Sequence, residues 1–226
     1  MKSINNTARI TGFVYLLLVP LGLFGLLVVP GDASVAASNI KASESLFRLS
    51  IVAALLVQLV NVFVVLALYQ LLRPVNTKMA LLMVIFLLLG VPIAMLNELN
   101  QVAVLVLISG ADYLTAFTAE QLRALVPVFL RLHEQGLNLA GFFWGLWLFP
   151  MGYLVFKSGF LPRALGVLLI LGCFGYLVDS FAAFLLPYYG MKIAALTFWG
   201  EVCLPLWLLI NGVNVERWQT RALAPA

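Results

Sequence analysis

The chain has 226 residues, of which 64% are apolar and only 10% charged, and its formal net charge is +4. A soluble globular domain carries roughly 25% charged residues, so this composition excludes an ordinary soluble protein and indicates an integral membrane protein. The length provides for about six spans of ~20 residues with short connections, and leaves too little for a separate soluble domain. We therefore expect a single all-α membrane domain over residues 1–226.

Long apolar runs separated by short polar connections predict six transmembrane helices in one bundle. The expected spans cover about residues 10–29, 48–72, 79–108, 136–156, 164–186 and 193–213. The first run is about 20 residues long, which favours a retained span over the 7 to 15 apolar residues of a cleaved signal peptide. Glycine and proline predict breaks within three spans, at Gly90-Val-Pro92, Phe149-Pro-Met-Gly152 and Cys203-Leu-Pro205. In the first span, Pro20 with Gly22 and Gly25 would bend the helix or let a neighbour approach closely.

A helix of a different kind is predicted over about residues 119–132, ahead of the fourth span. Thr118 and Gln121 have the spacing of a capping box at its start. Apolar side chains recur on one face of this helix and charged side chains lie largely on the other. We expect such an amphipathic helix to lie along the outer membrane interface.

Cations are divided unevenly between alternate connections. One side has eight cations and one acid, whereas the opposite side has five of each. The eight are Lys2, Arg9, Arg73, Lys78, Lys157, Arg163, Arg217 and Arg221. Connections rich in Lys and Arg stay in the cytoplasm, so both termini are predicted to be cytoplasmic.

Polar side chains inside the apolar runs are the candidate functional residues. Counting helix rise from the outer end of each span places Glu98, Asp179 and Glu201 at a similar depth, about 12 to 15 Å below the surface, on three separate helices. Polar groups in hydrocarbon are costly, and they mark either a pocket or a polar contact between helices. We expect an outward-facing pocket, to which further polar residues contribute: Asn97, Gln101, Gln58, Asn138, His133 and Glu134.

Three functions are open for such a pocket. No lysine or arginine lies at its depth, so each acid is protonated, shares a proton or meets a cation. The first hypothesis is therefore binding or transport of a proton, a cation or a small polar solute. The second is an intramembrane enzyme acting on a lipid-linked or periplasmic substrate, with a carboxylate as general acid. The third is an accessory or structural membrane protein without a ligand.

Several chemistries lack their usual sequence signals. The chain has one histidine and neither an HExxH nor a GxSxG element, so no metal and no cofactor are predicted. It has no phosphate-binding glycine loop and no basic patch with interleaved aromatics, so no nucleic-acid partner is expected. The expected partners are the lipid bilayer, a small cation or polar solute, and a second copy of the chain. Gly141 and Gly145 form a small-residue motif that serves either such a dimer or packing within one bundle.

Four parts of the chain resemble a known bacterial membrane family. They are Leu68–Asn76, Phe129–His133, Gly152–Gly166 together with Gly175–Ala182, and Trp207–Asn214. These stretches are similar to the family catalogued as domain of unknown function 4386, and the likeness extends over nearly the whole chain. The resemblance implies a multi-span protein of the bacterial cytoplasmic (inner) membrane. It implies no activity and supplies no catalytic or binding residues.

Overall fold

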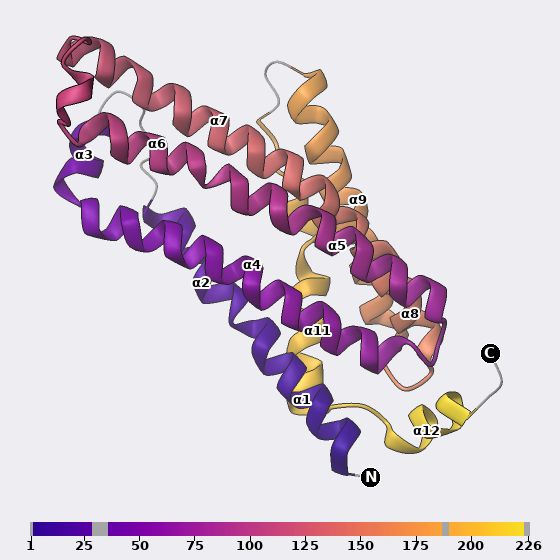
Figure 1. Cartoon of the computed structure of the whole chain (residues 1–226). Coiled ribbons are helices and arrows are strands. Elements are labelled where there is room, and N and C mark those ends of the chain that lie inside the picture. The colour runs from indigo at the N-terminus through magenta and orange to yellow at the C-terminus, as the bar shows by residue number, and fades with distance from the viewer. Residues whose placement is uncertain (1, 29–35, 187–189, 224–226) are drawn as a thin grey trace.

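Helices make up the architecture of the protein. This computed structural model describes residues 2–28, 36–186 and 190–223, and this part of the chain contains no strand. Figure 1 shows long helices that run side by side along an elongated bundle. The predicted all-α class is confirmed.

The first half of the chain forms three long crossings of the bundle and two short helical segments. Its elements are α1 (Lys2–Leu16), α2 (Leu18–Val28), α3 (Ala36–Ala42), α4 (Glu44–Leu72), α5 (Thr77–Asn97), α6 (Leu99–Ile108) and the 3-10 turn η1 (Asp112–Leu114). The second half contains α7 (Ala119–Leu146), α8 (Leu148–Ser158), α9 (Arg163–Leu185), α10 (Ala194–Thr197), α11 (Trp199–Ile210) and α12 (Val215–Leu223).

Five described stretches are long and apolar enough to cross a membrane: Ile4–Phe24, Glu44–Leu72, Thr77–Ile108, Ala119–Ser158 and Arg163–Leu185. A sixth, Ala194–Ile210, qualifies when it is taken with Val215–Leu223, from which it is bent by 103°. The described chain therefore provides five or six crossings, where six are predicted. Residue 29, at the end of the first predicted span, lies outside the described residues.

The helix predicted over residues 119–132 forms, and it continues without a break into the fourth span. The Gln121 N–H donates to Thr118 Oγ1 at 3.2 Å and the Thr118 N–H donates to Gln121 Oε1 at 2.8 Å, which confirms the capping box. From there α7 and α8 form one crossing of 40 residues. The apolar face of α7 packs inside the protein, where Val126 contacts a cluster that includes Val104 of α6. Protein therefore covers part of the face that was expected to lie on lipid.

Only some of the helix breaks fall near the glycines and prolines that predicted them. The structure places them at Leu17, Glu98, Trp147 and Phe198, and α5 runs through Gly90-Val-Pro92 without interruption. Leu17 and Trp147 each lie three residues before a proline. Because a proline ring clashes with the preceding turn and removes an N–H, it distorts the helix on its N-terminal side. The predicted sites at Gly90 and Cys203 were wrong, and the site at Phe149 was displaced by two residues.

Both termini of the described chain lie at one end of the bundle (Figure 1). The Val213 N–H donates to Asn5 Oδ1 at 3.0 Å, which joins the start of α1 to the segment that precedes α12. Trp218 Nε1–H on α12 donates to the carbonyl of Leu71, at the end of α4, at 2.8 Å. We call this the terminal end, and the opposite end, with α3, η1 and the start of α7, the η1 end. Which of the two faces the cytoplasm stays a prediction.

The Gly141 and Gly145 motif faces α9 of the same chain. A Cβ atom on Gly145 would lie 2.7 Å from the Cβ of Tyr176, and one on Gly141 would lie 3.6 Å from Ser180 Oγ. Small residues here let α7 and α9 approach closely. This packing accounts for the motif within one chain, and a homodimer through it stays a prediction.

Candidate functional site

The candidate site lies where α5 and α6 meet. Glu98 separates the two helices, and its N–H donates to the carbonyl of Met95, at 3.3 Å, instead of continuing the regular ladder. The interruption coincides with the polar run Asn97–Gln101, from which Asn97, Glu98 and Gln101 contact His133 on α7. Local helix geometry thus changes at the position where buried polar side chains need partners on a neighbouring helix.

A glycine on α7 makes room for this site. The Asn97 side chain occupies the space that a Cβ atom on Gly136 would need. Asn97 Nδ2 donates to the carbonyl of His133 at 2.8 Å, one turn of α7 away. The close approach of α5 and α7 at this level therefore depends on the missing side chain at Gly136.

The imidazole of His133 contacts two side chains of the polar run, Glu98 and Gln101. Its Nε2 atom lies 3.1 Å from Glu98 Oε1 and 2.9 Å from Gln101 Nε2. The three residues are buried, with exposed fractions of 7% for His133, 5% for Glu98 and 3% for Gln101. We refer to Asn97, Glu98, Gln101 and His133 as the Glu98 cluster. Four of the nine predicted site residues thus come together in the structure.

The contacts of His133 Nε2 require a proton in a defined place. Nε2 without a proton and a carboxylate oxygen are both acceptors, so a proton must lie between Nε2 and Glu98 Oε1 at this separation. If Nε2 carries it, the N–H donates to Glu98 and the Gln101 amide must turn its oxygen toward the imidazole; if Glu98 carries it, the single lone pair of Nε2 accepts from Glu98 and is shared with the Gln101 N–H. The position of one proton and the orientation of one amide are therefore linked.

Two acceptor atoms of the Glu98 cluster have no partner. Glu98 Oε2 and Gln101 Oε1 are buried and make no hydrogen bond within the described chain. Buried polar atoms are almost always paired, so such exceptions are characteristic of groups that exchange protons or hold an ion or water. Asn100, which is partly exposed, donates to Asn97 Oδ1 at 3.0 Å and extends the polar contacts toward the surface.

Asp179 lies in a different environment from Glu98. Its Oδ1 and Oδ2 atoms accept the N–H groups of Ile193 and Ala194, each at 2.8 Å, at the start of α10. A carboxylate that accepts two main-chain N–H groups anchors the segment that donates them. Asp179 therefore fixes α10 to α9, and these two contacts are structural.

The other four candidates, Glu201, Gln58, Glu134 and Asn138, do not belong to the Glu98 cluster. Glu201 lines a separate cavity with Tyr15 and Tyr176, and Gln58 is buried on α4 with its Oε1 atom unpartnered. Glu134 is exposed. Asn138 donates to Gln135 at 3.5 Å. The three acids thus occupy three environments, and the single convergent pocket expected from their depths is not what the structure shows.

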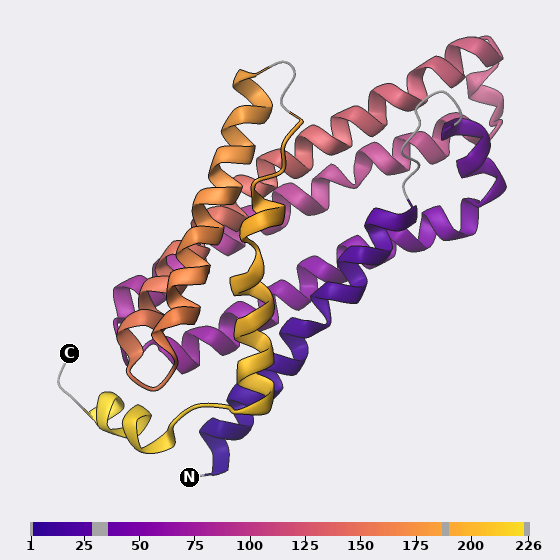
Figure 2. The ribbon, with the colours of Figure 1, turned by 180° about the vertical axis from the view of Figure 1, so that it is seen from behind.

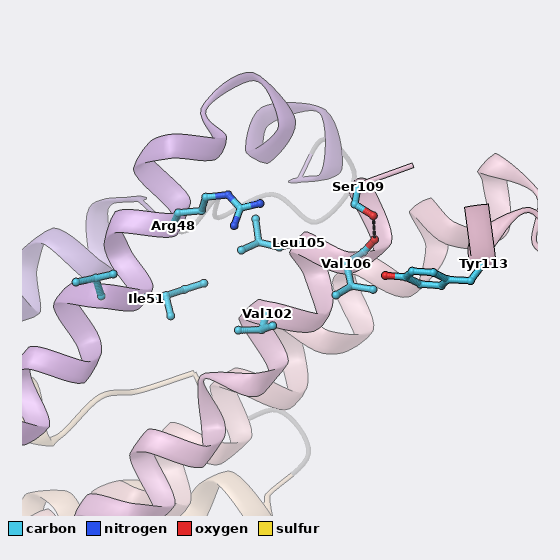
Figure 3. A pocket seen from close by; sticks show the side chains of 8 residues that line it. Arg48, Ile51, Val102, Leu105, Val106, Ser109 and Tyr113 are labelled. Carbon is cyan, nitrogen blue, oxygen red and sulfur yellow. Dashed lines mark hydrogen bonds between the residues drawn. The ribbon is translucent and has the colours of Figure 1, made fainter. Parts of the chain in front are cut away.

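A groove of about 390 Å³ opens between α4 and α6 at the η1 end (Figure 3). Its lining is mostly aliphatic, with Arg48, Ser109 and Tyr113 as the polar members. Arg48 is already paired with Glu44, at 2.7 Å, and Ser109 Oγ donates to the carbonyl of Val106 at 2.7 Å. None of the predicted site residues lines this groove.

Several residues that shape these sites from neighbouring helices had no recognisable signal in the sequence. Gly136 carried no polar signal, and its role appears only when α5 and α7 are seen in contact. Tyr15 faces Glu201, and Trp144 has a buried Nε1 atom without a partner, but in the sequence both are indistinguishable from other aromatic residues of a span. No group of three or more metal-ligating side chains occurs in the described residues.

The chain belongs to a family of multi-span membrane proteins. The model of a domain of unknown function, DUF4386, matches residues 10–212. The chain is 32% identical over 164 residues to an uncharacterized protein of Archaeoglobus fulgidus, an alignment that covers 72% of this chain and 83% of the relative. No solved structure matches it significantly. The resemblance to this family is confirmed, and the family brings no ligand or reaction with it.

Proposed function

We propose that this protein binds a proton reversibly inside the membrane, at Glu98 and His133. The observation that supports the proposal most directly is the 3.1 Å contact between Glu98 Oε1 and His133 Nε2 in a buried setting. Carboxylates and imidazoles at such depth are costly and recur in proton relays. The neighbouring Gln101 amide turns when the proton moves, so transfer is coupled to the reorientation of one side chain.

A proton suits this site better than a metal cation. Metal ions in proteins take several oxygen, nitrogen or sulfur ligands, and Glu98 is the sole acid of the cluster. The imidazole and the two amides can each donate or accept a hydrogen bond. Of the ligands considered from the sequence, the proton therefore has the strongest structural support.

The proposed proton site lies toward the η1 end of the bundle. Glu98 lies ten residues from the end of α6 at Ile108, which corresponds to about 15 Å along the helix. The cation distribution predicts that this end faces away from the cytoplasm, and the resemblance to the family implies that the membrane is the inner membrane of a bacterium. On that orientation the cluster exchanges its proton with the outer side.

The single histidine provides a direct test. The full-length protein, labelled with ¹⁵N in its imidazole and held in lipid nanodiscs, gives one histidine signal pair, which is followed by NMR across the range in which imidazoles and carboxyls titrate. We expect Glu98→Gln to change the titration curve of His133, because the partner that shares its proton is lost.

Glu134→Gln is the matched control, since Glu134 follows His133 directly and is exposed. It is expected to leave the curve of His133 nearly unchanged. Superimposable curves for the wild type and Glu98→Gln would contradict the proposal.

A further inference from the structure

A second polar cavity lies deeper in the bundle, apart from the Glu98 cluster. It has a volume of about 140 Å³, and its polar and aromatic lining comes from five of the long crossings. These residues are Tyr15, Asn61, Trp144, Trp147, Tyr176 and Glu201. Leu87 of α5 also lines it, eleven residues before Glu98, or about 16 Å along the helix. We call it the Glu201 cavity.

The Glu201 cavity contains a buried carboxylate and a buried donor that has no partner. Tyr15 is only 4% exposed, and its hydroxyl and that of Tyr176 face Glu201. Trp144 Nε1 is buried and makes no hydrogen bond in the described chain. A buried polar atom without a partner costs stability, so this one marks a space that the protein itself does not fill.

Three of the four helix breaks adjoin this cavity. Leu18, which begins α2 directly after the break at Leu17, lines the cavity. Trp147, which also lines it, is itself the break between α7 and α8. Glu201 is the third residue of α11, which follows the break at Phe198. Figure 2 shows α11 between α1 and α9, and it contacts both. Broken helices around a buried acid are typical of ligand sites in membrane proteins.

The chemistry of the lining selects for positive charge. Glu201 is its sole charged side chain, and two tryptophans and two tyrosines surround it. Aromatic faces carry negative potential and attract cations, most strongly where water is excluded. An anion would meet the carboxylate and the ring faces unfavourably.

We propose that the Glu201 cavity binds a small organic cation of the alkylammonium class. Glu201 neutralises the charge, and the rings of Trp144, Trp147 and Tyr176 contact the alkyl groups. An engineered cavity of about 150 Å³ accommodates benzene, so the volume here suits a ligand of about six non-hydrogen atoms. This inference does not depend on proton binding at Glu98.

Tetramethylammonium is a suitable probe, and the fluorescence of the wall tryptophans is a suitable readout. The full-length protein in lipid nanodiscs is titrated with tetramethylammonium chloride against equal concentrations of sodium chloride. tert-Butanol is a neutral control of similar size. We expect a saturable change with tetramethylammonium and none with either control.

Glu201→Gln keeps the side-chain size and removes the charge, and it is expected to weaken tetramethylammonium binding at least tenfold. Glu216→Gln on α12, which is exposed, is the matched control and is expected to bind like the wild type. Unchanged affinity in Glu201→Gln, equal binding of tert-butanol, or no saturable response in the wild type would each overturn the proposal.

A second variant covers the case in which Glu201→Gln does not fold. Val57 lines the same cavity from α4, and Val57→Phe places a ring inside its volume while leaving Glu201 in place. We expect this variant to fold, as judged by its thermal unfolding, and to lose the tetramethylammonium response. An unchanged response in the folded variant would equally overturn the proposal.

Discussion

Asp179 and Glu98 are both buried acids near the η1 half of the bundle, and their surroundings give them different roles. Each oxygen of Asp179 accepts a main-chain N–H at 2.8 Å, from Ile193 and Ala194. Glu98 contacts a titratable imidazole through one oxygen and leaves the other without a partner. The two main-chain contacts of Asp179 fix the start of α10, whereas Glu98 faces a side chain that can exchange a proton.

The comparison teaches that depth in the membrane is a weak guide to function. The two acids were expected to share a pocket because they lie at similar distances from the ends of their helices. Their roles follow from the identity of the atoms that face them. Removing Asp179 should therefore affect folding, and removing the charge of Glu98 should affect protonation.

The largest effect on stability is expected from Asp179→Ala. Each hydrogen bond to a charged group contributes about 1.5 to 3 kcal/mol, so the loss of two should lower the free energy of unfolding by about 3 kcal/mol or more. Hydrogen exchange at the amides of Ile193 and Ala194 should become faster in this variant. If exchange and the unfolding midpoint stay unchanged, Asp179 does not anchor α10.

Gly136→Ala should have the next largest effect. Its Cβ atom would enter the space of the Asn97 side chain, and overpacking of this kind costs about 1 to 3 kcal/mol. The NMR signal of His133 should shift as well, because Asn97 bonds its carbonyl. Gly22→Ala is the control, since no other atom lies within 4 Å of a Cβ atom there. Equal stability of the two variants would contradict the packing described for α5 and α7.

Glu98→Gln should change stability by about 1 kcal/mol or less, although the residue is buried. Glutamine has nearly the same shape and can still hydrogen-bond to His133, so no polar group is newly left alone. Thermal unfolding of the two proteins in the same lipid checks this. A loss as large as that of Asp179→Ala would show that Glu98 is a structural residue too, and would remove the contrast between the two acids.

The smallest effect is expected from Glu134→Gln. The side chain is exposed, and substitutions at such positions change stability by about 0.5 kcal/mol or less. Its thermal unfolding should match that of the wild type. A larger change would mean that the charge beside His133 contributes to the Glu98 cluster.

The sequence was sufficient for the membrane architecture because long apolar runs and their connections are read directly from residue order. The capping box at Thr118 and the end of α4 at Leu72 follow from local chemistry. Helix breaks were harder to place, because a proline distorts the turn before it, as at Trp147. The break at Glu98 has no proline or glycine beside it.

The site was partly predictable because several of its residues are close together in the sequence. Asn97, Glu98 and Gln101 are adjacent in sequence, and His133 is the single histidine, so their meeting across α5 and α7 could be anticipated. The partner of Asp179 could not, because the start of α10 reaches it only through the fold. Distance along a helix axis gives depth but not the direction in which a side chain points.

The measurement that tests the central claim most directly is the infrared difference spectrum of the full-length protein between high and low pH, recorded in lipid. A protonated carboxyl group has a carbonyl band that a carboxylate lacks. The account predicts a pH-dependent carboxyl band that disappears in Glu98→Gln and persists in Asp179→Asn. A band unaffected by Glu98→Gln, or lost in Asp179→Asn instead, would contradict the assignment of the exchangeable proton to Glu98 and His133.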